Sequence, residues 1–308
     1  MVAQKSGERR MSRNQALAML VAGMALAGSS VVVGKMLVAS LPVFTTAFGS
    51  LLVALCCMLP LMVGRFGELL CLTRREWAYL MLQGMCGIVL FRVFTLYGLH
   101  RTGALQAGLI TGATPAVLAL LSLIFLGERP SRRSLMAIFL AVVGCMAINF
   151  PSGSTCSEGE LVGSLLVVAA VVCEALFTIF RKRISSSVAA TPNTFVLIFC
   201  SLLMLAVPAG LEIGRMEFTP SLGDILAVFY YGAFATVVAY LLWTSAVGQV
   251  SGALAGVATA AMPVSSALLA VMVLGERPHP LQLLGGLLVT AAIVVAALGS
   301  RSYSGSRS

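Results

Sequence analysis

Histidine and paired acidic residues are scarce in this sequence, and their scarcity excludes most catalytic chemistry. Only two histidines, His100 and His279, occur in 308 residues, and the 11 Asp and Glu residues form no pair within an apolar segment. Acid–base catalysis depends on such groups lying together. The stretches between apolar segments are also too short to hold a separate domain. We therefore expect a protein that is not an enzyme.

Motifs that bind metals or nucleotides are also missing from the sequence. The eight cysteines show no Cys-x-x-Cys spacing, which is the usual pattern of a structural zinc site. No Gly-x-x-x-x-Gly-Lys-Ser/Thr loop is present, which argues against a pump driven by nucleotide hydrolysis. We expect no metal and no cofactor, so that any transport must draw on a gradient.

Charged residues make up only 10% of the chain, whereas hydrophobic residues make up 59%. A helix needs ~20 apolar residues to cross a hydrocarbon core of ~30 Å, and continuously apolar segments of about this length recur between short polar breaks. The strands of a membrane barrel would instead alternate apolar and polar residues. The predicted fold is therefore an all-α integral membrane protein. We predict ten transmembrane helices, at 15–36, 43–64, 77–98, 103–125, 133–150, 161–181, 193–213, 223–246, 252–273 and 281–299.

Basic residues are distributed unevenly between the two ends of these segments. With the N-terminus inside, fifteen of the 20 Lys and Arg residues fall on the cytoplasmic side, as the positive-inside rule requires. We predict a multi-pass protein of the cytoplasmic (inner) membrane whose tails, 1–14 and 300–308, are both cytoplasmic. The net charge of +9 mostly reflects this topology. Because the basic residues are dispersed, we expect no nucleic-acid binding.

An internal repeat divides the chain into two halves. The motif Leu-Gly-Glu-Arg-Pro, which starts at Leu126, returns 148 residues later, starting at Leu274. Each half, 15–150 and 161–299, contains five predicted helices. An odd number makes the second half enter the membrane from the opposite side, so we predict two inverted five-helix repeats. Inverted repeats are typical of transporters that alternate between inward-open and outward-open states.

Two prolines, Pro115 and Pro263, occupy equivalent positions in the two halves. Each removes the helical hydrogen bond to the carbonyl four residues earlier, which belongs to Thr111 or Thr259. Broken backbone at membrane depth persists only where protein or a wet cavity covers it. We predict helix breaks at both prolines and expect Thr111 and Thr259 to line a central path. A simple kink that shapes the bundle is the alternative.

Two charged side chains lie inside predicted helices, Arg92 in the third and Glu174 in the sixth. Each costs ~2.5–3.5 kcal/mol at a helix centre on insertion scales, so an interaction must offset it. We hypothesise that both face a shared cavity, where Arg92 binds a carboxylate and Glu174 an ammonium group of a zwitterionic substrate. A buried ion pair that joins the halves is the alternative. If transport is coupled to protons, Glu174 is the leading proton site, whereas exchange or facilitated diffusion would need no such site.

A polar and aromatic helix face adds further candidates for substrate binding. The repeat register maps position 92 onto Tyr240, and Thr236, Trp243 and Thr244 lie on the same face of the predicted helix. Such a face could stack an aromatic or cationic substrate. Trp243 lies near the cytoplasmic end, where tryptophan also serves as an anchor at the membrane interface. Tyr240 and Trp243 are therefore included as candidate substrate-binding residues.

These features together resemble the EamA-type transporters of the drug/metabolite transporter superfamily. The resemblance covers residues 15–298 and rests on the two repeats with their prolines and Leu-Gly-Glu ends, on Gly34-Lys35, and on Ala239-Tyr240-Leu241-Leu242-Trp243. It implies a basket-like bundle of ten helices whose central cavity passes amino acids or other small metabolites, often outward. The family commonly has an arginine early in the second helix, where this chain has Phe48-Gly49-Ser50. A role that depends on that arginine is not implied here.

The sequence thus predicts a secondary transporter, an exporter of amino acids or related compounds that works by alternating access. A multidrug exporter of lipophilic cations, attracted by Glu174 and the aromatic face, is an alternative. A non-transporting structural bundle or a channel is an alternative of another class. The expected partners are a small-molecule substrate, the lipid bilayer and coupling protons. Ten helices suffice for a complete cavity, so we expect a monomer.

Overall fold

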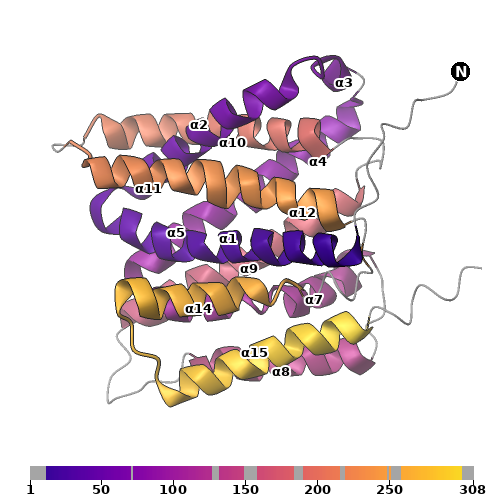
Figure 1. The fold of residues 1–308 in the computed structure, drawn as a ribbon, viewed down its shortest axis with the longest axis vertical. Helices are drawn as coiled ribbons and strands as arrows, with labels where there is room; N and C mark the ends of the chain where they lie inside the picture. The colour runs from indigo at the N-terminus through magenta and orange to yellow at the C-terminus, as the bar shows by residue number, and fades with distance from the viewer. Residues whose placement is uncertain are drawn as a thin grey trace, which may run out of the picture.

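The computed structural model describes residues 12–70, 72–126, 132–148, 158–183, 190–215, 219–247, 250 and 258–299. All regular structure within these ranges is helical, as the composition predicts, and the helices lie side by side in one bundle (Figure 1). Most of the first Leu-Gly-Glu-Arg-Pro motif and of the two tails lies outside the described residues. The elements are α1 (Arg13–Ser40), α2 (Val43–Met62), α3 (Gly67–Leu70), α4 (Arg74–Gly84), η1 (Met85–Leu90), α5 (Phe91–Arg101), α6 (Ala104–Thr111), α7 (Thr114–Leu126), α8 (Arg132–Ile148), α9 (Glu158–Arg183), α10 (Ala190–Ile213), α11 (Leu222–Gly232), η2 (Ala233–Val238), α12 (Ala239–Val247), α14 (Ala261–Leu274) and α15 (Pro280–Gly299).

Six helices among the described residues are long and apolar enough to cross a membrane. They are α1, α2, the continuous helix from α4 to α5, α9, α10 and the continuous helix from α11 to α12. The pair α6 and α7 is a seventh candidate, bent by 42° at a break. Shorter apolar helices lie within α8, α14 and α15. The structure is therefore that of a multi-pass helical membrane protein, while the count of ten spans stays a prediction.

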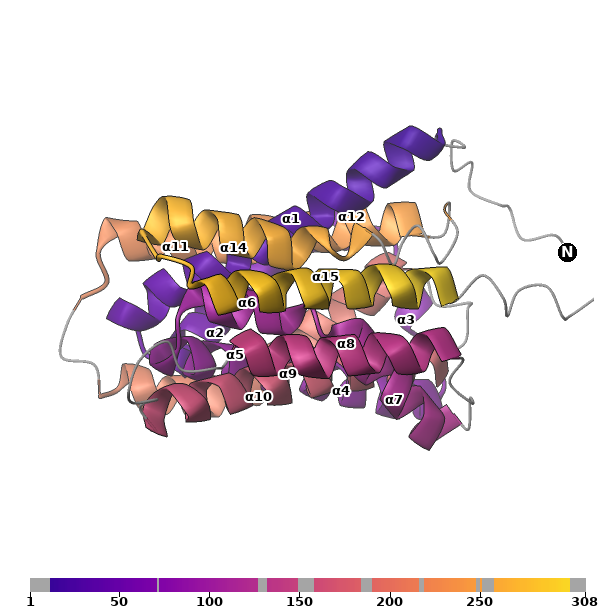
Figure 2. The same cartoon turned by 90° about the horizontal axis from the view of Figure 1, so that it is seen from below.

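The helices form two layers. Figures 1 and 2 show α1, α11, α12 and α14 in one layer and α4, α5, α9 and α10 in the other. α8 packs against α15 at one end of the bundle, and α2 packs against α10 at the other end. α1 begins and α15 ends on the same side of the bundle (Figure 1). The layers bring segments of the first and second halves into contact throughout.

Several local features recur 148 residues apart. The π-helical turns η1 and η2 occupy equivalent positions, and Pro60 within α2 corresponds to Pro208 within α10. Contacts between helices recur in the same way. α4 packs on α10 as α11 packs on α2, and α5 packs on α9 as α12 packs on α1. Equivalent segments of the two halves therefore make equivalent contacts.

Charged side chains secure helix ends on the side of the bundle opposite the start of α1. Glu276 accepts hydrogen bonds from the backbone N–H groups of Ala104 and the next residue, each at 2.8 Å, at the start of α6. The Lys35 ammonium donates to the carbonyls of Leu99 and Thr102 at the end of α5, at 2.6 and 2.9 Å. Both charges oppose the sign of the local helix dipole. The glutamate of the second repeated motif thus caps a helix of the first half.

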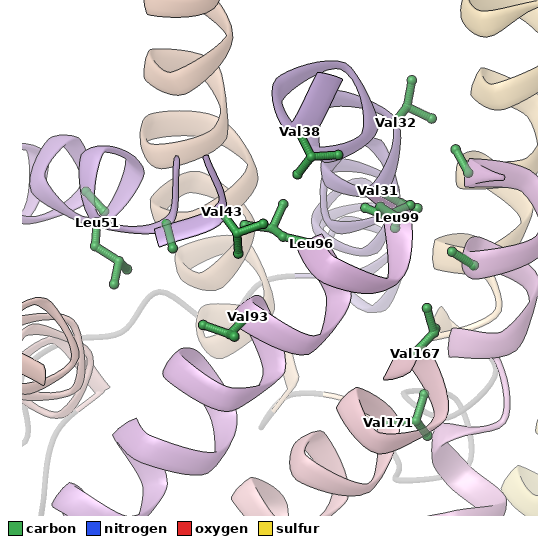
Figure 3. Close-up of a cluster of buried hydrophobic side chains, with 14 of the residues drawn as sticks. Val31, Val32, Val38, Val43, Leu51, Val93, Leu96, Leu99, Val167 and Val171 are labelled. Atoms are coloured by element: carbon green, nitrogen blue, oxygen red, sulfur yellow. The ribbon is translucent and has the colours of Figure 1, made fainter. Parts of the chain in front are cut away.

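The apolar core is shared by helices of both halves. Val31 and Val38 of α1, Leu96 of α5 and Val167 of α9 belong to one buried cluster (Figure 3). Close backbone contacts complement this cluster, as between α8 and α15, where a Cβ atom added at Gly144 would lie 2.9 Å from the carbonyl oxygen of Gly285. Because lipid gives no hydrophobic incentive for helices to associate, such close packing must hold the bundle together.

Candidate functional site

A helix break interrupts the fourth predicted transmembrane segment. α6 ends at Thr111 and α7 begins at Thr114, and the two parts are bent by 42°. Pro115 is therefore the second residue of α7, where a missing N–H costs little because the N–H groups of the first turn have no acceptor within the helix. Pro263 is likewise the third residue of α14. Both prolines lie in the first turn of a helix instead of kinking a continuous one.

The backbone carbonyls that these prolines leave free find local partners. The Thr111 carbonyl accepts a hydrogen bond from the Thr114 hydroxyl at 2.7 Å. The Thr259 carbonyl accepts one from the backbone N–H of Met262 at 3.1 Å. The Thr111 hydroxyl, in turn, donates to the Gly108 carbonyl at 2.6 Å. These bonds stabilise the breaks, and a role of Thr111 and Thr259 in lining a path stays a prediction.

Glu174 lies beside the break between α6 and α7. Its Oε2 atom accepts a hydrogen bond from the Thr114 hydroxyl at 2.8 Å. Helix α9 positions the carboxyl group there because it packs on α7, and also on α4 and α5. The side chain is partly buried near the middle of α9. No Lys or Arg among the described residues pairs with it, so a single hydroxyl is its protein partner.

The Thr114 hydroxyl connects Glu174 to the helix break. It lies within hydrogen-bonding distance of both the Glu174 carboxyl group and the Thr111 carbonyl, but it has only one proton. When Glu174 is ionised, the hydroxyl can donate to only one of them. When Glu174 is protonated, its carboxyl group can donate to Thr114, and Thr114 can donate to the Thr111 carbonyl. The protonated form therefore satisfies both contacts at once.

Arg92 is the centre of a second polar cluster, built from three other elements. Its guanidinium donates hydrogen bonds to Ser50 Oγ on α2 and to Thr236 Oγ1 on η2, the latter at 2.9 Å. The Cζ atom lies 4.6 Å from the centre of the Tyr231 ring on α11, a cation–π contact. The side chain is only 8% exposed. Two hydroxyls and an aromatic ring thus replace water around this charge.

Local backbone features bring these groups to Arg92. At the turn η2, the Thr236 hydroxyl donates to the Tyr231 carbonyl, five residues earlier, at 2.8 Å, which leaves the hydroxyl oxygen free to accept from Arg92. Gly232 allows α11 to approach α2, because a methyl group there would overlap the Ser50 carbonyl oxygen. Ser50 lies where the family resemblance leads one to expect an arginine. Arg92 reaches this place from the third predicted helix instead.

Arg92 and Glu174 do not contact each other in this structure. Arg92 bonds to Ser50 and Thr236, whereas Glu174 bonds to Thr114. The direct ion pair that the sequence left open is therefore absent from this conformation. Two separate polar clusters take its place, and neither charge pairs with an opposite charge within the described part of the chain.

An aromatic pair connects the helices that carry the two clusters. Phe177 of α9 and Tyr240 of α12 pack edge to face, with ring centroids 6.3 Å apart and planes at 82°. Phe177 lies one helical turn after Glu174, and Tyr240 lies one turn after Thr236. Tyr240 therefore lies one turn from Thr236 of the Arg92 cluster and, through Phe177, contacts the helix that carries Glu174.

Trp243 lies in a different environment from Tyr240. It packs against a buried cluster that includes Ala16 and Leu20 of α1. The Thr244 hydroxyl donates to the Tyr240 carbonyl at 2.8 Å, on its own helix. The contacts thus relate Tyr240 to the polar clusters, whereas those of Trp243 are apolar packing.

Several residues of the two clusters were not singled out from the sequence. Thr114 directly precedes Pro115, and this position next to a predicted break was an available signal. Ser50 was noted only as a position where the family commonly has an arginine. Tyr231 and Phe177 are single residues in long apolar helices, and nothing local distinguishes them. Their roles arise only from tertiary contacts.

The long apolar helices, the broken helix and the two charges at membrane depth together define a multi-pass membrane protein of the transporter type. The chain belongs to the EamA-like transporter family, whose sequence profile matches residues 14–150 and, a second time, residues 161–298. Membership supports a transporter role and leaves the substrate open.

Relatives of known name agree with this assignment, and a solved structure shares the fold. The chain is 35% identical over 283 residues to the uncharacterized transporter YetK of Bacillus subtilis (strain 168), covering 91% of this chain and 86% of the relative. It is 24% identical over 226 residues to a protein of Streptantibioticus cattleyicolor named "probable terminal-alkyne amino-acid exporter", covering 72% and 73%. A solved crystal structure has the same fold, with a TM-score of 0.66 at 19% identity, covering 94% of this chain and 99% of the other.

Proposed function

We propose that this protein is a secondary transporter that exports amino acids or related small metabolites by alternating access. The observation that carries the proposal is the environment of Arg92, a buried guanidinium with no carboxylate partner among the described residues. A buried charge without a counter-charge is costly, and a substrate carboxylate would supply one in a geometry that suits the guanidinium. Glu174, which has no cationic partner there either, would accept an ammonium group. The name of the Streptantibioticus relative supports the same substrate class and direction.

The alternating-access part of the proposal rests on the internal repeat. We infer ten transmembrane helices in two inverted repeats, 15–150 and 161–299. The double match of the family profile supports two repeats. Pairs such as α8 with α15 and α2 with α10 are contacts between equivalent helices, which supports a two-fold relation between the halves. Exchange of conformations between two such halves would convert an inward-open state into an outward-open state.

Proton coupling is the proposed source of energy, with Glu174 as the proton site. Its support is the hydroxyl of Thr114, which can satisfy both of its contacts only when the carboxyl group is protonated. Proton binding would then favour one geometry of the break between α6 and α7, and proton release would favour another. Such a two-state element is what coupling requires.

The proposed setting is the cytoplasmic (inner) membrane, with both tails in the cytoplasm. The start of α1 and the end of α15 on one side of the bundle support a common side for the tails (Figure 1). The excess of basic residues predicted for that side supports its assignment as cytoplasmic. We propose a monomer with the small-molecule substrate, lipid and protons as its partners.

A multidrug exporter of lipophilic cations is the second candidate. The observation that favours it is the position of Phe177 and Tyr240 one turn from Glu174 and Thr236. An acid next to aromatic rings suits a quaternary ammonium compound. Arg92 argues against this candidate, because a second positive charge at the site would repel a cation.

Efflux from proteoliposomes tests both candidates. Vesicles that contain the purified protein are loaded with a mixed pool of amino acids and, separately, with a fluorescent quaternary ammonium dye, with and without a pH gradient. We expect selective, gradient-dependent loss of amino acids. Loss of the dye alone would favour the multidrug candidate, and loss of neither compound would contradict both.

A further inference from the structure

Two opposite charges, from α1 and from the end of α14, hold the connection between α5 and α6. The Lys35 ammonium of α1 binds the carbonyls of Leu99 and Thr102 at the end of α5. The Glu276 carboxylate, directly after α14, binds two backbone N–H groups at the start of α6. The two charges also attract each other across the connection. Each side of this connection is therefore fixed by a charge from another helix.

The end of α14 directs Glu276 at the connection. Gly275 has a φ of 67°, a left-handed conformation that suits glycine, and the Glu276 N–H donates to the Ala270 carbonyl at 3.2 Å. A Cβ atom added at Gly103 would lie only 3.0 Å from the Glu276 carboxylate, so glycine allows the close approach. The second Leu-Gly-Glu-Arg-Pro motif thus supplies both the turn and the charge.

The connection is buried, and one polar group in it has no partner. Leu99, Thr102 and Ala104 are 0%, 2% and 0% exposed. The Thr102 hydroxyl has no hydrogen-bond partner among the described residues. A buried hydroxyl without a partner favours a conformation in which water reaches it. The closed arrangement therefore depends on contacts that offset this cost, and the two charges provide them.

Both charges recur in the other half of the sequence. A shift of 148 residues relates Lys35 to Arg183, the last residue of α9. The same shift relates Glu276 to Glu128, which lies outside the described residues. A residue with a purely local role need not recur in an inverted repeat, whereas a residue that takes part in alternation between two states is expected to recur.

We propose that Lys35 and Glu276 form a latch that keeps the outer end of the transport path closed. The proposed topology makes this end of the bundle the outer one. The latch rests on the alternating access of the proposed function and identifies the contacts that break before substrate leaves. In the outward-open state both charges release the connection, and water reaches Thr102. Loss of either charge should therefore favour the outward-open state.

Labelling with a membrane-impermeant thiol reagent tests the latch in intact cells. Thr102→Cys places a cysteine in the connection, and Thr111→Cys, in a separate protein, places one at the far end of α6. A cationic methanethiosulfonate reagent is added outside, and each labelled peptide is quantified by mass spectrometry. Glu276→Gln and Lys35→Met should each raise the labelling rate at both positions roughly 10-fold, as expected for the loss of a hydrogen bond to a charged group. The two changes alter the local charge in opposite directions, so attraction of the reagent cannot explain a rise in both.

Glu212→Gln is the matched control. Glu212 of α10 also accepts a hydrogen bond at the start of a first-half helix, from the backbone N–H of Thr45 at 2.7 Å. Its equivalent in the other half is Gly64, so this charge does not recur. The control should lower the melting temperature as the neutral latch variants do and leave labelling at both positions unchanged. Glu276→Asp and Lys35→Arg keep the charge, should raise labelling less, and replace the neutral variants if those fail to insert.

Transport measures the same shift independently. Uptake of radiolabelled L-threonine into right-side-out membrane vesicles is compared for the wild type, the neutral latch variants and the control. The latch variants should lower the KM for L-threonine added outside by up to roughly 10-fold, because a larger fraction of the protein exposes its site outward. The control should leave this KM unchanged.

The outcomes separate the latch from the proposed function. A rise in labelling at position 102 alone would show that the charges only cap helix ends, and the latch would be wrong. Unchanged labelling in the neutral latch variants, an equal rise in Glu212→Gln, or an unchanged KM despite labelling at both positions would also overturn the latch. If the wild type transports no amino acid but the expected labelling pattern appears, the latch stands and the proposed substrate class falls.

Discussion

The two charged side chains at membrane depth are held in opposite ways. Arg92 is enclosed by groups on three other elements, with two hydroxyls and an aromatic ring around its guanidinium. Glu174 is partly buried and has one hydroxyl partner, which belongs to a broken helix. A fixed charge suits a permanent binding site, whereas a loosely held acid beside a break suits a group that changes its protonation and its partners. The difference supports the proposed roles of Arg92 in substrate recognition and of Glu174 in coupling.

The largest effect is expected from Arg92→Ala. This change removes the positive charge and leaves the hydroxyls of Ser50 and Thr236 without the guanidinium. The variant would also lose the proposed charge-assisted hydrogen bonds to the substrate carboxylate, each worth about 1.5–3 kcal/mol. This loss should lower amino-acid transport by roughly 100-fold or more. Transport is measured in proteoliposomes, and membrane insertion is checked by membrane fractionation. Arg92→Lys keeps the charge without the fork and should retain a small part of the activity.

Normal transport by Arg92→Ala would contradict the assignment of substrate recognition to this residue. A variant that fails to insert would instead show that the cluster is needed for folding. In that case Arg92→Lys, which retains the buried charge, decides between a role in substrate recognition and a purely structural role. A folded lysine variant with a raised KM would support recognition, and one with an unchanged KM would support a purely structural role.

Glu174→Gln should have a smaller and different effect. Glutamine can still accept a hydrogen bond from Thr114, but it can neither ionise nor release a proton. We expect the dependence of transport on a pH gradient to disappear, while exchange of labelled for unlabelled substrate at equal pH continues with a raised KM, because glutamine has no negative charge for the substrate's ammonium group. The measurement is counterflow compared with gradient-driven efflux. If gradient-driven efflux survives in this variant, the coupling proton is bound elsewhere.

A second comparison uses two glycines at equivalent positions in the halves. A methyl group at Gly232 would overlap the Ser50 carbonyl oxygen, whereas one at Gly84 would lie 3.1 Å from the Ser201 hydroxyl, which can rotate away at the loss of its hydrogen bond to the Gly84 carbonyl. Gly232→Ala should therefore lower stability by about 1–3 kcal/mol and reduce transport several-fold, because it displaces Ser50 from Arg92. Gly84→Ala should lower both the stability and the transport rate by less. Equal effects at the two positions would show that the Arg92 cluster tolerates movement of α11.

The sequence predicts the fold better than the site, for physical reasons. Apolar length and the repeated motif depend on local composition, so the helices could be located from residue types alone. Arg92 and Glu174 stand out for the same reason, since a charge within an apolar segment is visible without any structure. Their partners were not predictable, because Ser50 and Tyr231 come to Arg92 through the close approach of α2 and α11 at Gly232. Direct pairing of the two charges, which their depths allowed, does not occur.

The smallest effect is expected from Thr114→Val, which separates Glu174 from the helix break without removing the acid. Valine keeps the shape of threonine, so the loss is confined to hydrogen bonds worth about 1 kcal/mol, or roughly a five-fold change in an equilibrium constant. Protonation of Glu174 could then no longer strengthen the bond to the Thr111 carbonyl. Gradient-driven efflux should therefore become less sensitive to pH, while the KM for amino acids should stay unchanged. Thr114→Ser keeps the hydroxyl and should behave like the wild type. If the valine variant retains the full pH dependence, Glu174 acts without the break, and the contrast with Arg92 reduces to a difference in burial.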